Sequence, residues 1–344
     1  MDLTRIPGLV ADLVVYLFTV MPNFLPTVLA LSTPIALGAL CGVMCERSGV
    51  VNIGIEGIML TSAFFGYLAG FVLHESIGDL PALIVGVAVA VLVGVILGLV
   101  HGWLCISVRA DQIIAGVFLN IAALGLTGYL NRLIVTPSGK GGAGLLPHVT
   151  VPDAVANLPL VGPVVGMFFN QGPIAMSVVF LVVGLQFLLF RSRWGLRTRA
   201  VGEHPKAADT VGIDVLALRY RNVVVGCALA GLAGAFIILE STGTFSNGMT
   251  NGRGFIALAA VIFGRWTPVG AFLGALLFGF VSALQTMVGV APPSGDLGTI
   301  MGQIPNQWYA ALPYVVTIVV LAGVVGRSIP PAADGVPYEK EARA

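Results

Sequence analysis

The sequence predicts an all-α protein that crosses a lipid bilayer many times, and three observations support this prediction. Of its 344 residues, 57% are hydrophobic and only 10% are charged, whereas soluble domains carry about 25% charged residues. The apolar residues gather in stretches of roughly 20, the length of a helix that spans the hydrocarbon core. Only three of the 33 charged residues (17 Lys or Arg and 16 Asp or Glu) lie within the apolar pieces.

Eight apolar stretches are long enough to cross the membrane on their own. They are residues 26–45, 53–73, 81–106, 112–130, 173–190, 222–240, 268–290 and 307–326. Two shorter pieces, 8–21 and 255–264, fit a span, a half-helix or an interfacial helix. We favour the interpretation in which both cross, which gives a bundle of about ten elements with both termini in the cytoplasm. If 8–21 lies on the membrane surface instead, the N-terminus is outside.

Lysine and arginine set the predicted orientation, because short loops rich in these residues stay in the cytoplasm. The connection 191–221 holds seven of the 17 basic residues and is therefore predicted to be cytoplasmic. The Gly- and Pro-rich connection 131–172 holds only two and is predicted to lie outside. Counting crossings from these two connections places Arg47 and Arg109 inside and the acidic turn 74–79 outside. The three assignments agree with one another.

One transmembrane domain, residues 1–326, accounts for nearly the whole chain. The remainder, 327–344, combines Pro330 and Pro331 with charges of both signs, and we predict a disordered cytoplasmic tail. The four cysteines all lie in apolar stretches. We predict that they act as small buried hydrophobic residues, with no disulfide and no metal site.

The segment ERSGVVNIGIEG, residues 46–57, interrupts what would otherwise be one long apolar tract. Irregular backbone in a membrane is tolerated only where protein or a water-filled cavity satisfies it, so such a break indicates a transporter's solute path. We predict Asn52 and Glu56 as solute-path residues, and a helix contact would also suit Glu56. The alternative is a short cytoplasmic turn with Glu46 and Arg47 in water.

A second interruption, residues 240–254, also follows an apolar span and precedes a short apolar piece. Gly-rich polar breaks at matching places in two halves indicate an inverted repeat of broken helices. Asn247 and Arg253 are its candidate solute-path residues. An ordinary external loop is the alternative.

Two amides, Gln112 and Asn120, lie eight residues apart in the span 112–130. That spacing places them on roughly one face of a helix. They can hydrogen-bond a polar solute or hold a neighbouring helix, and the pattern does not choose between these roles.

The cytoplasmic stretch 199–215, RAVGEHPKAADTVGIDV, predicts a short helix that begins at Pro205, because proline suits the first helical position. A short helix rich in small residues and flanked by charge suits docking against a soluble partner. A solvated amphipathic loop is the alternative.

Sites for chemistry are not found in the sequence. The one Gly-Lys pair, in TPSGKGG, lacks the first glycine of a P-loop and is followed by glycine. The four histidines are scattered and no HExxH occurs. We therefore predict no catalytic residues, no cofactor and no ATPase site, and the net charge of +1 gives no indication of a nucleic-acid partner.

The segments 46–60 and 199–215, in this order, resemble the inner-membrane permeases of bacterial ABC importers for simple sugars and nucleosides. The likeness covers about 24–326 and includes GCALAGLAGAF at 226–236 and the block 254–280. It is closest to the nucleoside branch that works with basic-membrane-protein-type lipoproteins. The chain departs from ribose-type relatives at Asn52, where those have Asp, and this favours a neutral solute.

The resemblance implies a coupling loop that docks on an ABC ATPase. The residues that match it are Arg199, Gly202, Glu203, Pro205, Ala207, Ala208, Gly212 and Ile213. It further implies alternating access, with ATP used by the partner ATPase, a second homologous or identical permease, and an external solute-binding lipoprotein. The departures at 1–23 and at Arg265-Trp266 have no assigned effect.

Two rival functions follow from the same sequence. An ion-coupled secondary transporter or channel needs an ion or proton site in the membrane, for which Glu56 is the firm candidate. A membrane enzyme needs a reactive constellation, and none is found. Activity without any ATPase would favour the first rival.

Overall fold

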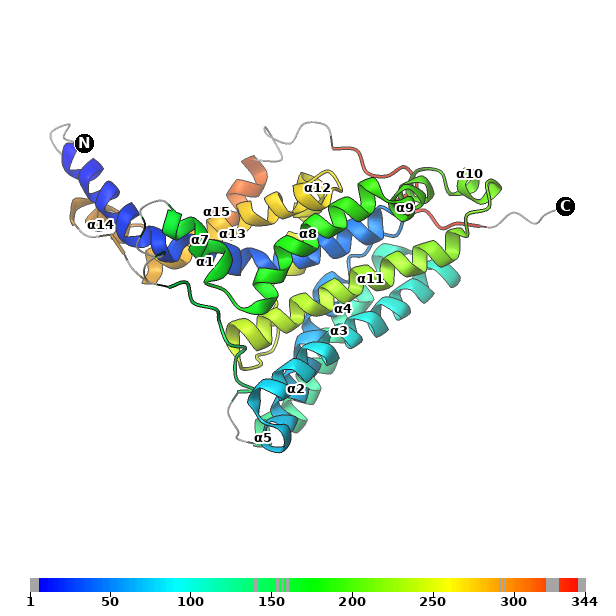
Figure 1. Cartoon of the computed structure of the whole chain (residues 1–344), viewed down its shortest axis with the longest axis horizontal. Helices are drawn as coiled ribbons and strands as arrows, with labels where there is room; N and C mark the ends of the chain where they lie inside the picture. The colour runs from blue at the N-terminus through cyan, green and yellow to red at the C-terminus, as the bar shows by residue number, and fades with distance from the viewer. Residues whose placement is uncertain are drawn as a thin grey trace. The chain divides into compact units, whose positions relative to one another are not determined.

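The secondary-structure elements of the computed structural model are helices (Figure 1). It describes residues 6–138, 142–152, 155, 158, 161–290, 292–293, 295–319 and 328–339. Within these residues no β-strand occurs, which agrees with the predicted all-α class. In the described part of the chain, seven helices are long and apolar enough to cross a membrane, so the chain is a multi-pass membrane protein. The predicted inverted repeat stays a prediction.

The helix bounds follow the predicted spans closely. The transmembrane helices after the first are α2 (Ile55–Ile77), α3 (Asp79–Gly102), α4 (Gln112–Leu130), α8 (Pro173–Arg191), α11 (Val215–Ala235) and α13 (Pro268–Val290). Helices α3 and α11 continue as π-helical turns, Trp103–Ser107 and Phe236–Thr242. The predicted piece 255–264 is α12 (Arg253–Phe263), which is too short to span alone. The last predicted span is α15 (Asn306–Val319) as far as 319, and the rest of it lies outside the described residues.

The N-terminal piece differs from the prediction. Residues 8–21 and 26–45 form one continuous helix, α1 (Ile6–Glu46), of 41 residues. At 1.5 Å per residue, such a helix is roughly 60 Å long, about twice the thickness of the hydrocarbon core. No turn separates the two pieces, so 8–21 is not the separate crossing that we favoured. The span within α1 begins at Asn23.

The chain divides into two compact units, and several helices pass from one into the other. The smaller unit holds residues 1–32, 148–176 and 276–326. In it the middle of α1 lies beside the middle of α13, where Phe24 and Phe280 meet edge to face with ring centroids 5.2 Å apart. Gln171 donates to the Pro26 carbonyl at 2.7 Å. Its further helices, α7 (Val161–Phe169) and α14 (Gly295–Gly302), were not predicted.

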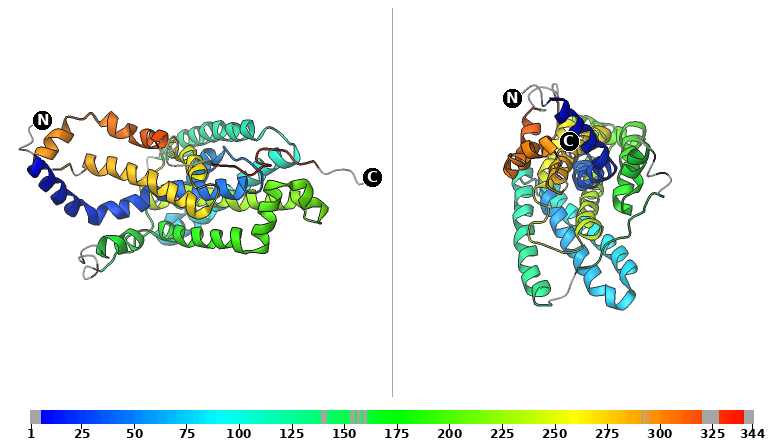
Figure 2. Two further views of the ribbon diagram at one scale, coloured as in Figure 1. Left: turned by 90° about the horizontal axis from the view of Figure 1, so that it is seen from above. Right: turned by 90° about the vertical axis from the view of Figure 1, so that its left-hand side faces the viewer.

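The larger unit holds residues 33–147, 177–275 and 327–344 and contains every site discussed below. Helices α2, α3 and α11 lie against one another (Figure 2), and α2 and α11 are mostly buried. Helices α3 and α4 expose large apolar side chains such as Leu92 and Phe118. Because lipid is apolar, these exposed faces suit contact with the bilayer. Helices α3 and α11 approach closely at Gly94 and Gly231, where a side chain on either would overlap the other's backbone.

The C-terminal segment is also part of the larger unit. We predicted a disordered tail from 327, but residues 328–339 run along the structure as an extended segment with turns. The buried side chains of Ala333 and Tyr338 hold it there. Composition alone suggested disorder because prolines and charges dominate the segment, and composition does not show contacts with distant elements.

Candidate functional site

The first break lies between α1 and α2, where residues 47–54 leave the helix. Side chains of α4 bind its backbone. The Gln112 side-chain oxygen accepts from the Val51 N–H at 2.6 Å. Asn120 donates to the Ile53 carbonyl at 3.0 Å and accepts from the Gly57 N–H at 2.7 Å. Both amides are buried, so in this structure they hold the break. Solute contact by either stays a prediction.

Asn52 lies at the centre of the first break with no exposed surface. Its side-chain oxygen accepts from the Gly54 N–H at 3.0 Å, which turns its NH2 group toward sulfur atoms. The nearest sulfur belongs to Cys227, at 3.4 Å. Contact with a solute through this residue is not visible here and stays a prediction.

Three thiols surround that amide. The sulfur atoms of Cys41, Cys45 and Cys227 lie within 4.8 Å of one another, and all three residues are buried. By number and spacing the group suits a soft metal ion. The sequence shows only the α1 pair at helical spacing, because Cys227 reaches it from a distant helix. The prediction of small buried thiols without a metal is not tested by this geometry.

Glu56 joins the two breaks. Its carboxylate accepts from the Gly252 N–H at 2.7 Å and from the Gly254 N–H at 2.6 Å. These donors stand at the start of α12, where helix N–H groups lack partners and the helix dipole favours a negative charge. Arg253 lies close enough to interact electrostatically with the same carboxylate. The structure therefore brings the candidates Glu56 and Arg253 together, and the helix contact that we considered for Glu56 is its visible role.

The other end of α12 is held by the start of the same break. Trp266 donates its indole N–H to the buried carboxylate of Glu46. Arg47 donates to the carbonyls of Trp266 at 2.7 Å and Arg265 at 3.2 Å. Glu46 is thus not a residue in water. Residues in or beside the first break, namely Glu46, Arg47 and Glu56, therefore hold both ends of α12.

Arg265 and Trp266 adopt left-handed backbone conformations, with φ of 51° and 53°. Such a conformation costs on the order of 1 kcal/mol or more per non-glycine residue and persists where neighbours hold it. The bonds from Glu46 and Arg47 supply that hold. The sequence marked this pair only as unusual, since nothing local links it to a segment 219 residues away.

The second break is held partly by its own backbone and partly by other segments. After the π-helical turn, its backbone forms local bonds such as Asn251 N–H to Gly248 carbonyl at 2.9 Å. Ser246 and Asn247 are exposed, and Asn247 accepts from Asn131 at 3.0 Å. Phe245 packs against Phe64 of α2, with ring centroids 5.0 Å apart. Sequence reasoning missed this aromatic contact because aromatic residues in apolar spans normally indicate core.

The predicted coupling stretch forms α9 (Arg193–Glu203) and α10 (Pro205–Thr210), and α10 begins at Pro205 as predicted. Gly202 lies directly against the Arg47 carbonyl, where any side chain would clash. Arg47 and Arg199 both lie over the ring of Phe190, at 5.6 Å and 5.0 Å. The coupling stretch thus contacts the first break through backbone and through shared packing.

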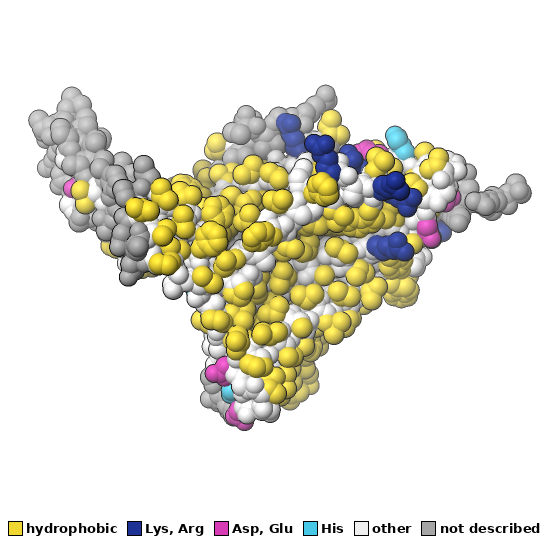
Figure 3. Space-filling view, in the orientation of Figure 1, with side chains coloured by type: hydrophobic (Ala, Val, Ile, Leu, Met, Phe, Trp, Pro, Cys, Tyr) yellow, Lys and Arg dark blue, Asp and Glu magenta, His cyan; other side chains and the backbone are white. Residues whose placement is uncertain are grey.

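The eight predicted coupling residues fall into two groups. Three are exposed: Glu203, Ala207 and Gly212. The Glu203 carboxylate accepts from the Ala332 N–H at 3.1 Å. The others are wholly or partly buried and position the element: Arg199, Gly202, Pro205, Ala208 and Ile213. Figure 3 shows basic side chains gathered at the end of the molecule where α9 and α10 lie. The structure therefore presents an exposed face on a packed support, as a docking element requires.

Comparison with known proteins gives a consistent result. Residues 24–321 match the family described as branched-chain amino acid transport system / permease component. The guanosine ABC transporter permease protein NupQ of Bacillus subtilis is 38% identical over 322 residues, which is 92% of this chain and 97% of that protein. The nucleoside ABC transporter permease protein NupC of Lactococcus lactis is 36% identical over 310 residues, 90% of this chain and 94% of that protein. A putative glucose ABC transporter permease of Haloferax volcanii is 36% identical over 309 residues, 86% of this chain and 90% of that protein.

Proposed function

The chain belongs to the branched-chain amino acid transport system / permease component family, and from that premise we propose that it carries nucleosides into the cytoplasm. It is a multi-pass permease subunit of an ABC importer in the cytoplasmic (inner) membrane. Nucleosides are favoured over simple sugars because the relatives named for nucleosides match more of this chain. A simple sugar is the alternative solute.

The observation that carries the proposal is the contact between the coupling stretch and the first break. Gly202 of α9 touches the Arg47 carbonyl, so α9 cannot move toward the break without moving Arg47. Packed interiors transmit displacement because they contain few voids. Force applied by an ATPase to the exposed face of α10 therefore reaches the membrane-embedded part of the chain.

The first break passes that motion to α12. Glu46 and Arg47 hold the turn after α12, while Glu56 holds its first N–H groups. A helix of 11 residues held at both ends moves with its holders as one piece. In this proposal, ATP-driven closure shifts α9 and rocks α12, which opens and closes the solute path.

The second break supplies the solute-facing groups. Asn247 is exposed and offers an amide to a neutral polar solute, in keeping with the predicted preference. Phe245 is only partly buried and offers an aromatic face, on which a nucleobase stacks favourably. Together, an amide and an aromatic ring suit a nucleoside, which carries both a base and a polar ribose.

The partners follow from this role. An ABC ATPase docks on α9 and α10 and uses the ATP, so the permease itself contributes no catalytic residue. A second permease, identical or homologous, completes the path, and an external lipoprotein delivers the solute. The ion-coupled transporter is disfavoured by Glu56, because its carboxylate is already engaged by two backbone donors.

Reconstitution tests the proposal. Proteoliposomes holding the permease, its ATPase and its binding protein should accumulate guanosine only when ATP reaches the ATPase. Ala207→Trp, on the exposed face of α10, should abolish accumulation, whereas Leu80→Trp in the exposed first turn of α3 should not. Accumulation without the ATPase would contradict the importer mechanism. Uptake of glucose but not of guanosine would replace the solute class and leave the subunit role intact.

A further inference from the structure

The extended segment 328–339, here named the C-terminal strap, crosses the end of the larger unit where α9, α10 and the start of α11 lie. The Ser328 hydroxyl donates to the Ile262 carbonyl at 2.9 Å. The Ala333 N–H donates to the Gly202 carbonyl at 2.8 Å. The Arg219 guanidinium donates to the Val336 carbonyl at 3.0 Å. These hydrogen bonds, each accepted by a main-chain carbonyl, fix the path of the strap on three separate elements.

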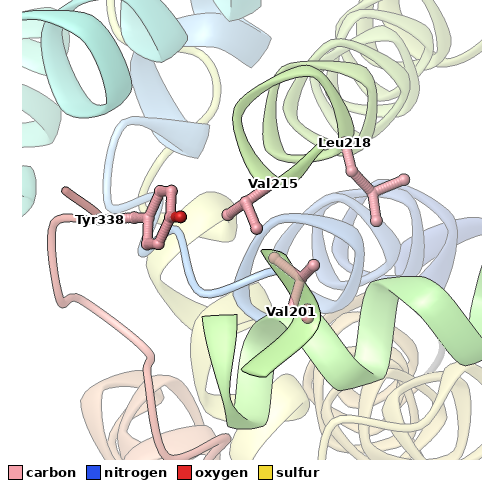
Figure 4. Close-up of a cluster of buried hydrophobic side chains, with 5 residues drawn as sticks. Val201, Val215, Leu218 and Tyr338 are labelled. Atoms are coloured by element: carbon pink, nitrogen blue, oxygen red, sulfur yellow. The ribbon is translucent and has the colours of Figure 1, made fainter. Parts of the chain in front are cut away.

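Tyr338 anchors the far end of the strap and is only 6% exposed. It belongs to one apolar cluster whose other members come from α9, α10 and α11: Val201, Ala208, Val215 and Leu218. Figure 4 shows the ring of Tyr338 facing this cluster from the strap side. An exposed ion pair, Arg109 with Glu339 at 2.7 Å, follows immediately. Exposed pairs add little, so the tyrosine supplies most of the hold.

Helix α10 depends on that cluster. It has six residues, far fewer than the roughly 12 that an isolated helix needs to be even marginally stable in water. Its one buried side chain is Ala208, which packs in the cluster that Tyr338 completes. The position of α10 is therefore set by contact with its neighbours, the strap among them.

A pocket of about 410 Å³ opens between α10 and the strap. One wall is formed by His204, Pro205 and Ala207, and the other by the strap residues Val336 and Pro337. These walls are largely apolar, and both belong to the face that carries the exposed coupling residues. An apolar side chain projecting from a partner would fill such a pocket and anchor an interface.

We propose that the C-terminal strap and α10 together form one docking surface for the ATPase subunit, with the strap as its second wall. This inference rests on the proposed function. The occupant is the ATPase because the pocket is continuous with the exposed face of α10, which is the proposed ATPase-docking element. The strap holds α10 in place and contacts the ATPase itself.

Cysteine labelling tests the contact directly, because the four native cysteines are buried. Three single variants of the whole chain in nanodiscs are labelled with a maleimide with and without the purified ATPase. Val336→Cys reports the strap, Ala207→Cys reports α10, and Leu80→Cys reports the exposed first turn of α3. All three positions are exposed. We expect the ATPase to slow labelling of the first two by about tenfold and to leave the third unchanged, as burial in an interface would.

The outcomes separate the two proposals. Protection of Ala207→Cys without protection of Val336→Cys would overturn the docking role of the strap and leave the importer function standing. Protection of neither would contradict the importer function itself. In a second measurement, Tyr338→Ala should weaken ATPase binding by about tenfold, while Leu80→Ala, in the exposed first turn of α3, should bind like the unaltered chain. Equal binding by Tyr338→Ala would likewise overturn the role of the strap.

Discussion

The two breaks in the helical pattern differ in where their backbone groups find hydrogen-bond partners. The first, residues 47–54, depends on side chains from other helices, since Gln112 and Asn120 bind its backbone and α9 lies against it. The second, residues 240–254, forms its own turns and leaves polar side chains exposed. The first break therefore moves with the helices that hold it, whereas the second presents exposed polar side chains such as Asn247. We propose on this ground that the first break transmits force and that the second contacts the solute.

The largest expected effect is on stability: a bulkier side chain should destabilise the protein much more at the first break than at the second. Gly202→Val places a side chain against the Arg47 carbonyl, and backbone on both sides leaves no room to adjust. We expect a loss of about 3 kcal/mol in the free energy of unfolding, the upper part of the range for overpacking. Ser246→Val in the exposed second break is the matched control and should leave stability nearly unchanged. Thermal unfolding in detergent measures both, and equal midpoints would remove the distinction.

The carboxylate that links the breaks should give the next largest effect. Glu56→Gln leaves one oxygen to serve two N–H groups, those of Gly252 and Gly254, so one buried donor loses its partner. The expected loss is about 2 kcal/mol, because bonds to charged acceptors contribute roughly 1.5–3 kcal/mol. Glu203→Gln, at an exposed carboxylate, is the control. An unfolding midpoint that matches the unaltered chain would show that the carboxylate does not hold α12.

Two asparagines sharpen the comparison further. Asn120→Leu leaves Gly57 N–H and the Ile53 carbonyl without this partner, and should cost about 1–3 kcal/mol in stability. Asn247→Ala removes an exposed side chain and should change stability by less than about 0.5 kcal/mol. The order should be reversed for transport, because Asn247→Ala should weaken the apparent affinity for the solute more than Asn120→Leu does. Equal stability of both variants, with transport lost only in Asn120→Leu, would make Asn120 the solute contact instead.

The sequence predicted the helices well because hydrophobic length and charge segregation are local properties. Six spans and α12 lie within a few residues of their predicted bounds, and α10 begins at Pro205 as expected. The two breaks were also visible, because glycine and polar residues interrupt an apolar tract. Separate crossing by 8–21 was wrong, because the helix continues without a turn from the first apolar piece into the second.

The partners of the site residues could not be predicted, because they join distant segments. Nothing near Glu46 in the chain indicates that it accepts from Trp266, and nothing near Tyr338 indicates Ala208. A break in the sequence shows that backbone groups need partners but not which side chains supply them. The sequence identified Gln112 and Asn120 as a pair on one helix face. Which groups they bind depends on tertiary contacts, which the sequence does not show.

The smallest expected effect concerns pH and the C-terminal strap. Burial raises the pKa of Asp334 to about 7, and the nearby Cys45 adds to this, while Arg219 acts in the opposite direction. Glu46 also faces the group from α1. The Oδ1 atom of Asp334 is buried and has no hydrogen-bond partner among the described residues. The docked strap therefore favours the protonated acid.

The sign of the pH effect follows from that preference. A free strap loses the Asp334 proton near the ordinary value of 3.8, and the docked strap keeps it until about pH 7. Docking is thus strongest in acid, weakens as the pH rises toward 7, and then stays constant. Between about pH 6.3 and 8 we expect a loss of about 1 kcal/mol, measured as increased mobility of a spin label on Val336→Cys. Asp334→Asn should abolish this dependence, and a dependence that survives in that variant would assign the proton to another group.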